Sequence, residues 1–360
     1  MNQIRVLVSG IPSVFKPNGT SVRTRRVLEA LRDCYDVHLV TKADEYVEVS
    51  FIQREKTHLL KHERSRLWPA RLALFAMKNR FDVVICENEP LAFLVHLIFS
   101  KLRAEKVIYE AHGILWQEAE GRGERPTRVR IRRAIERFCV KNADFIIALS
   151  EEIRKEHEKF NSRIALIPVF LEETPTGPDS RKDTRERSRR VGVIGPFNNL
   201  RNMHTLDFIS AHIDDISSDL SFVVIGNCEK RVQHPRISFT GFIDRPEKYN
   251  SVLKELDAVV VIEIVATSGP LTKILEPMML GVPVITTSKG AIGLGHLQNY
   301  ENIVIAEEKE MVDTLNKVLS DGQLLERIGR NARELAVEHH GFDKNAERLI
   351  SVVSQVIGSQ

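Results

Sequence analysis

Several features that mark common protein classes are scarce in this 360-residue chain. Its four cysteines lie far apart without a Cys-x-x-Cys pair, so we expect reduced thiols and neither a disulfide framework nor a zinc site. The first residues do not resemble a secretory leader. No apolar run approaches the ~18 residues that span a bilayer. We therefore expect a cytoplasmic protein.

An excess of charge of one sign is also missing. Lys and Arg total 52 against 49 Asp and Glu, and this small excess gives no reason to expect a nucleic-acid partner. The basic residues gather locally in the arginine-rich segment Arg122–Arg133, which leads into a helical face with Ile131, Ile135, Phe138 and Cys139. This segment predicts either a peripheral contact with an anionic membrane or an ordinary solvated charged face.

Short β-branched runs alternate with helical patterns along the whole chain. Continuous apolar strands between amphipathic helices predict parallel sheets with both faces covered. At about 150 residues per domain, the length predicts two domains. We therefore expect an α/β fold with two Rossmann-like doubly wound domains, whose parallel sheets face each other across a cleft. The predicted strands are 4–8, 37–40, 83–86, 107–109, 145–149, 164–167, 191–194, 221–225, 237–240, 258–262, 283–286 and 303–306.

The domain boundary is predicted from composition. Residues 171–190 are mostly charged and contain two prolines, so they favour a linker over a core element. We expect an N-terminal, acceptor-side domain over 1–170 and a C-terminal, donor-side domain over 191–340. A final helix over 341–360 is expected to pack back on the N-terminal domain.

Ligands in doubly wound folds bind beyond the carboxyl ends of the strands, so the loops there are the places to search. Gly19 precedes a helical pattern, with Thr20 and Ser21 as expected caps, and would let backbone amides approach a phosphate. A plain turn explains this glycine equally well. His112 follows the strand at 107–109 and would contact a sugar, or would be a structural loop histidine.

The second half has two further loops of this kind. Gly195 ends a strand, and Arg201 follows at a helix start, where it would contact a diphosphate or remain solvated. The loop Ser268, Gly269, Pro270 and Leu271 would present amides to phosphate, with Lys273 adding charge. Glu276, three residues further on, would accept hydrogen bonds from ribose hydroxyls. The alternative is that Lys273 and Glu276 form an ordinary surface ion pair.

These pieces together resemble the retaining GT-B glycosyltransferases of family four, the glycosyl transferases group 1. Glu276 and the ending Gly281-Val282-Pro283-Val284 match that family's second glutamate and its Gly-x-Pro-Val ending, while Ser268 stands where its first glutamate falls. Gly269 and Lys273 resemble a branch with a glycine-rich loop and a lysine before the glutamate. The family's Gly-Arg pair becomes Gly195-Pro196 here, and Arg201 occupies the position of its lysine. Gly19 and Glu110-Ala111-His112-Gly113 resemble its other two loops.

The resemblance implies transfer of a sugar from a nucleoside-diphosphate sugar to an acceptor hydroxyl, with retention of configuration. Arg201, Lys273 and loop amides would hold the diphosphate, Glu276 the ribose, and His112 the reacting sugar. The acceptor would be a glycan, a lipid-linked saccharide or a small molecule. No Asp-x-Asp occurs, so we expect neither a metal nor another cofactor. A nucleotide-sugar epimerase and a catalytically degenerate donor-binding subunit are the alternatives.

Overall fold

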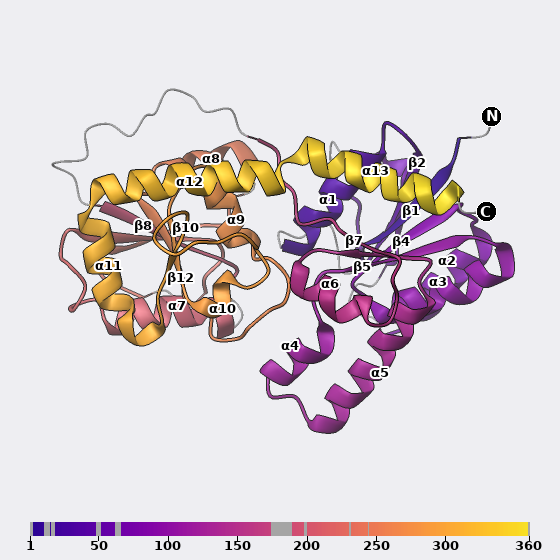
Figure 1. Cartoon of the computed structure of the whole chain (residues 1–360), viewed down its shortest axis with the longest axis horizontal. Helices are drawn as coiled ribbons and strands as arrows, with labels where there is room; N and C mark the ends of the chain where they lie inside the picture. Colours follow the sequence, from indigo (N-terminus) through magenta and orange to yellow (C-terminus); the bar gives the residue numbers. More distant parts are fainter. Residues whose placement is uncertain are drawn as a thin grey trace. The chain divides into compact units, whose positions relative to one another are not determined.

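The computed structural model describes residues 3–10, 15, 19–47, 52–61, 66–173, 189–197, 200–229, 232–243 and 245–358. The chain forms two compact units, the first comprising 1–170 with 342–360 and the second 171–341 (Figure 1). Most of the predicted linker, residues 174–188, lies outside the described residues. So do residues 11–14 and 16–18 of the loop before Gly19.

The first unit has a seven-stranded parallel sheet in the order β3-β2-β1-β4-β5-β6-β7. Its strands are β1 (Arg5–Gly10), β2 (Asp36–Thr41), β3 (Thr57–Leu59), β4 (Val83–Glu87), β5 (Lys106–Ala111), β6 (Phe145–Ala148) and β7 (Ile164–Leu166). The helices are α1 (Gly19–Leu31), α2 (Trp68–Lys78), α3 (Pro90–Arg103), α4 (Leu115–Gly121), α5 (Pro126–Asn142), α6 (Glu151–Glu158) and α13 (Phe342–Gly358). Helices α1 and α13 pack together, and on the other side of the sheet α3 packs between α2 and α5 (Figure 1).

The second unit has a six-stranded parallel sheet in the order β10-β9-β8-β11-β12-β13. Its strands are β8 (Arg189–Ile194), β9 (Leu220–Ile225), β10 (Ile237–Gly241), β11 (Ala258–Val261), β12 (Val284–Thr286) and β13 (Val304–Ile305). The helices are α7 (Leu200–Ala211), α8 (Pro246–Lys254), α9 (Thr272–Met279), α10 (Ser288–Ala291), α11 (Met311–Ser320) and α12 (Gly322–His340).

The predicted fold class, α/β with two doubly wound parallel-sheet units, is confirmed. Each predicted strand has an observed counterpart, and the short strand β3 is additional. The four cysteines are unpaired, as expected. Among the described residues, no helix combines the length and apolarity needed to cross a membrane.

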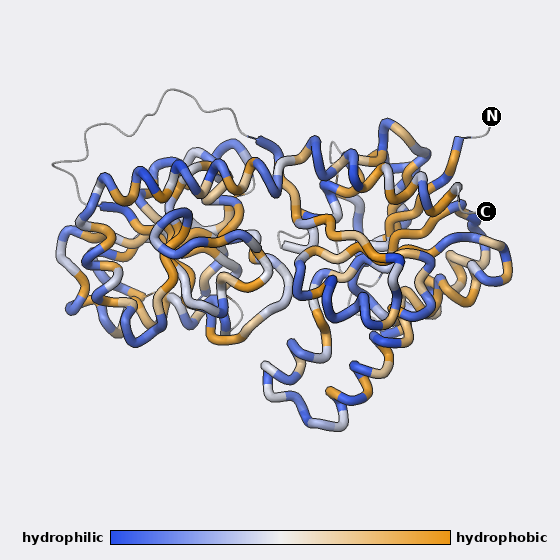
Figure 2. The backbone as a smooth tube through the Cα atoms, in the orientation of Figure 1, coloured by the Kyte–Doolittle hydropathy of each residue, from blue (hydrophilic) through white to orange (hydrophobic). Residues whose placement is uncertain are grey.

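The prediction for α5 was right about the helix and wrong about which side packs. Ile131, Ile135 and Phe138 are 59%, 37% and 48% exposed, and of the predicted face only Cys139 is buried. The buried side also carries Glu136, which accepts hydrogen bonds from backbone amides at the start of α4. The helix therefore packs through a mixed face and leaves an apolar one in solvent. In Figure 2, the tube at the position of α5 in Figure 1 alternates between hydrophobic and hydrophilic colours.

Candidate functional site

A buried glutamate organises the cations of the second unit. Glu263 follows β11 at the carboxyl end of the sheet, and its side chain is fully buried. Arg201 on α7 donates from Nε and Nη2 to Glu263 Oε2 at 2.9 and 2.8 Å, while Lys273 Nζ lies 2.6 Å from Oε1. One carboxylate thus orients two cations, and the cluster keeps a net charge of about +1.

Lys273 lies in a nearly enclosed polar site on α9. Besides Glu263, its ammonium donates to Asn202 Oδ1 at 2.8 Å, and Asn202 Nδ2 donates to the carbonyl of Pro196. Burial lowers the pKa of Lys273, and the neighbouring Glu263 carboxylate opposes that shift. The carboxylate therefore favours the charged form of the ammonium that an anionic ligand requires.

The predicted loop Ser268–Leu271 leads directly into α9, which begins at Thr272 with Leu271 as its N-cap. Gly293, at φ +87°, packs against the backbone of this loop. A Cβ there would lie 2.7 Å from the carbonyl carbon of Gly269 and 2.8 Å from the nitrogen of Pro270. Only glycine allows this close backbone approach, which sets the loop beside the cations at the positive end of the helix.

Glu276 and Lys273 bind different partners, which argues against a simple surface pair. The hydroxyl of Tyr249 on α8 donates to Glu276 Oε2 at 2.9 Å. Burial, together with the Glu276 charge, raises the pKa of Tyr249 well above its ordinary value, so the phenol remains a donor. The tyrosine fixes one carboxylate oxygen and orients Glu276.

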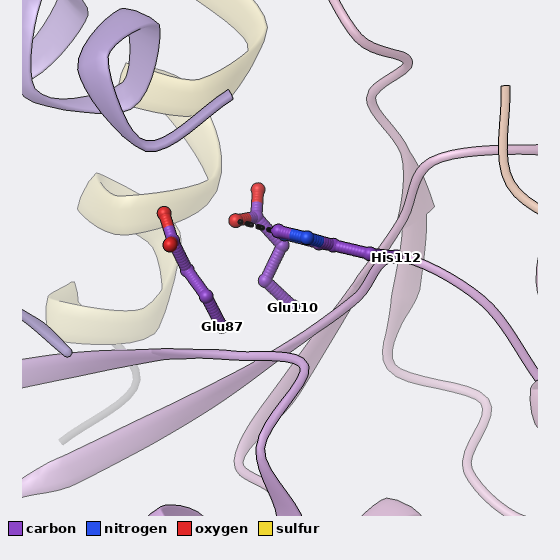
Figure 3. Close-up of side chains that lie close together, drawn as sticks. All are labelled: Glu87, Glu110 and His112. Atoms are coloured by element: carbon purple, nitrogen blue, oxygen red, sulfur yellow. Dashed lines mark hydrogen bonds and ion pairs between the residues drawn. The ribbon is translucent and has the colours of Figure 1, made fainter. Parts of the chain in front are cut away.

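The first unit contains a second buried polar cluster, around His112 (Figure 3). His112 Nε2 lies 3.1 Å from Glu110 Oε2, and its backbone amide donates to Asn88. Arg23 on α1 donates from Nε and Nη2 to the other oxygen of Glu110 at 2.9 and 2.6 Å. Burial alone would raise the pKa of Glu110, but Arg23 and His112 hold it at about 2. His112 is thus oriented by an ionised, buried carboxylate.

Glu87 at the end of β4 shares a hydrogen bond with Thr24 on α1. The single hydroxyl proton of Thr24 has two acceptors in reach, the Thr20 carbonyl at 3.0 Å and Glu87 Oε2. A proton on Glu87 would satisfy both contacts. Burial and the charge of Glu110 raise its pKa well above the ordinary value, which agrees.

Ligand atoms of Glu87, Glu110 and His112 lie within 4.8 Å of one another, a spacing that suits a metal ion (Figure 3). Their chemistry does not suit one. Burial and the charge of Glu110 raise the pKa of Glu87 and favour its protonated form, and the Arg23 guanidinium is already paired with Glu110. A cation would have to displace one positive charge and one proton from a fully buried site.

The structure brings some predicted residues together and leaves others apart. Arg201 and Lys273 meet on Glu263, and α9 joins them to the Ser268–Leu271 loop and Glu276. Gly19 is the exposed first residue of α1, so Thr20 and Ser21 lie inside that helix and are not its caps. Gly195 lies against Gly226. A Cβ added to Gly226 would lie 2.1 Å from the carbonyl oxygen of Gly195.

Sequence reasoning missed the buried acids Glu263 and Glu87 and the cation Arg23, and it gave Glu110 no role of its own. Each acid stands inside or directly after an apolar strand. An ionisable group at such a position needs a partner, and that was the available signal. Arg23 gave no signal of its own, because a basic residue on an amphipathic helix is ordinarily solvated.

Comparison with known proteins gives two family matches that together cover most of the chain. Residues 18–169 match the glycosyl transferase 4-like domain, and residues 188–321 match the glycosyl transferases group 1. A search of curated protein sequences finds no significant match.

Three solved structures illustrate the likeness in fold. HepE from Anabaena in complex with UDP has a TM-score of 0.72 at 15% identity, over 98% of this chain and 100% of that chain. Sucrose-phosphate synthase from Thermosynechococcus elongatus has a TM-score of 0.79 at 15% identity, over 100% of both chains. A glycosyltransferase from Rickettsia africae has a TM-score of 0.68 at 13% identity, again over 100% of both chains. At these identities the likeness establishes the fold.

Proposed function

The chain belongs to the glycosyl transferases of group 1, and from this premise we propose that it transfers a sugar from a nucleoside-diphosphate sugar to an acceptor hydroxyl with retention. The observation that carries the proposal is the cluster of Arg201 and Lys273 on buried Glu263, beside the N-terminus of α9. It provides two oriented cations and helix amides for a diphosphate.

In the proposed reaction, the bond between the anomeric carbon and the donor diphosphate breaks, a bond to the acceptor oxygen forms, and the acceptor's proton passes to the released diphosphate or to water. Arg201 and Lys273 stabilise the charge that grows on the leaving diphosphate. Glu276, oriented by Tyr249, accepts hydrogen bonds from the ribose hydroxyls. His112, oriented by Glu110, contacts the transferred sugar. Arg201 and Lys273 supply the positive charge that a metal ion would otherwise bring to the diphosphate.

We propose a uridine nucleotide as the first donor to test, because HepE from Anabaena was crystallised with UDP and with UDP-glucose. Thermal unfolding with UDP-, GDP-, ADP- and CMP-sugars should show a raised midpoint for the preferred donor, since binding to the native state stabilises it. Equal midpoints with every donor and with none would overturn the assignment of the cluster.

Transfer itself is tested by incubating the chain with the selected donor and a panel of glycan, lipid-linked and small hydroxyl acceptors. We expect release of the nucleoside diphosphate to depend on an acceptor, and the anomeric configuration of the product, read by NMR, to match that of the donor. Conversion of the donor sugar without an acceptor would identify an epimerase. Nucleotide binding with neither transfer nor hydrolysis would identify a degenerate binding subunit.

A further inference from the structure

The layer formed by α2, α3 and α5 exposes an unusual amount of apolar surface. Of the thirteen large apolar side chains exposed among the described residues, nine lie on these helices or at the N-cap of α2. Apolar residues exposed singly would instead be scattered over the whole surface. The nine are Leu67, Leu74, Met77, Leu91, Ile98, Leu102, Ile131, Ile135 and Phe138. We refer to them as the apolar face.

Each helix presents its apolar residues as one stripe. On α3, Leu91, Ile98 and Leu102 recur at intervals of seven and four, and on α5, Ile131, Ile135 and Phe138 recur at four and three. Such intervals place side chains on one side of a helix, here the side turned away from the sheet. Because α3 packs between α2 and α5, the stripes lie on neighbouring helices of one layer (Figure 1).

Basic residues dominate the charge of this layer, although the half-buried Glu89 forms the N-cap of α3. Helices α2 and α3 contain no acidic residue, and the only one in α5, Glu136, is buried. On the α5 helical wheel, exposed Arg128 and Arg130 stand on opposite sides of the apolar stripe. The nearby acid Glu124 is already paired with Arg122 and Arg132, so it does not balance the charge of all the arginines on this layer.

We infer that the apolar face is a docking surface for an anionic membrane, with its side chains inserted among the lipids and the flanking arginines on the headgroups. An apolar stripe bordered by cations is the pattern of helices that lie in a membrane interface. A second copy of the chain fits less well, because two faces of equal positive charge repel each other. The arginine-rich segment 122–133, singled out from the sequence, is then one margin of a larger surface.

The direct test is flotation of the full chain with vesicles, without nucleotide or sugar, so that its outcome is independent of the proposed function. Vesicles of phosphatidylcholine alone are compared with equal mixtures of phosphatidylcholine and phosphatidylglycerol. We expect binding to the anionic vesicles that weakens as salt is raised. No binding to the anionic vesicles at low salt would overturn the inference.

Insertion is tested with the double variant Ile98→Asn, Ile135→Asn, matched by Val47→Asn, which changes an exposed apolar residue outside the layer. The first should weaken binding at least tenfold, because two apolar side chains no longer leave water, and the second should leave it unchanged. Unchanged thermal midpoints show that both proteins fold. Full binding by the double variant would refute insertion.

The charge contribution is tested with Arg128→Gln, Arg130→Gln, matched by Arg327→Gln, Arg330→Gln on α12 for the same change in net charge. We expect about fivefold weaker binding to anionic vesicles for each flanking arginine removed, and no loss with the matched pair. Equal losses in both pairs would show attraction by net charge alone and refute the face. Sedimentation that reveals a dimer abolished by Ile98→Asn, Ile135→Asn would instead assign the face to self-association.

Discussion

Replacing Glu263 by Gln tests the proposed role of the cluster that Glu263 forms with Arg201 and Lys273. The change keeps the shape of the side chain but removes the charge shared by Arg201 and Lys273 and turns an amide donor toward one of them. Breaking a buried ion pair by removing one partner costs about 3–5 kcal/mol. Because Arg201 is 30% exposed, water compensates in part. We expect the free energy of unfolding to fall by about 3 kcal/mol, the low end of that range.

The effect on donor binding separates two explanations of Glu263. If the carboxylate only neutralises charge, its removal raises the positive potential, and UDP should bind more tightly. If it orients the cations, their contacts with phosphate loosen. Losing one charge-assisted hydrogen bond costs about 1.5–3 kcal/mol, which weakens binding at least tenfold. We expect the second result.

Urea unfolding measures the stability change, and calorimetric titration with UDP at pH 7 measures affinity. Repeating the titration at higher pH adds a check with a fixed sign. Without Glu263, the pKa of Lys273 should fall further, so the charged ammonium, and with it the affinity, should be lost at a lower pH than in the unmodified chain. A folded Glu263→Gln variant that binds UDP as tightly as the parent, or more tightly, refutes the orienting role.

Further predictions concern both units. Glu276→Ala should weaken UDP binding at least tenfold, as expected for lost charge-assisted hydrogen bonds, whereas Tyr249→Phe should weaken it less; calorimetry compares them. Gly293→Ala should lower the free energy of unfolding by about 1–3 kcal/mol and displace the loop, which a weaker UDP titration would reveal. His112→Ala should lower kcat about a hundredfold with UDP affinity unchanged, so a change in affinity alone would contradict its role. Burial raises the pKa of Glu136 to about 7, so the folded chain binds that proton more tightly and the free energy of unfolding should fall as pH rises from about 4.5 to 7. Glu136→Gln should lack this fall in urea titrations across that range.

The architecture was predictable because continuous apolar strands and amphipathic helices carry their own periodicity. All twelve predicted strands are present, but β3 was missed, since Thr57-His58-Leu59 is too short to show a pattern. The sequence also did not indicate which face of α5 packs against the rest of the unit. Ile131, Ile135 and Phe138 have the period of a core face, and only their exposure shows that the helix packs through its other side.

The candidate site was predictable where residues lie in one loop and hidden where they meet across the fold. Lys273 and Glu276 are close in sequence, and their segment was found by its pattern. Glu263 stands 62 residues from Arg201, and Arg23 stands 87 residues from Glu110. These pairs arise from strand order, which places neighbours in space that are distant along the chain. Tertiary contact therefore decides which charges are paired.

Strand order also reveals a parallel between the two units. In the first unit the strand order reverses between β1 and β4, and in the second between β8 and β11. Ligands of this fold usually bind at such a reversal. The strands β4 and β11 therefore occupy equivalent positions. Each ends near a buried glutamate, Glu87 in the first unit and Glu263 in the second. In both units the helix that follows the first strand faces this acid, with Thr24 of α1 bonded to Glu87 and Arg201 of α7 bonded to Glu263.

The surroundings of these equivalent acids differ, and this difference supports the ligand placement that we propose. Glu263 lies between two cations, so its cluster has an excess of positive charge that an anionic diphosphate can neutralise. In the first unit, Arg23 is paired with Glu110, and the raised pKa of Glu87 favours its neutral form, so this cluster has no comparable excess of positive charge. A neutral site of hydrogen-bonding groups suits sugar hydroxyls and gives a diphosphate no electrostatic reason to bind there. We therefore propose, on the basis of charge, that the second unit binds the nucleotide.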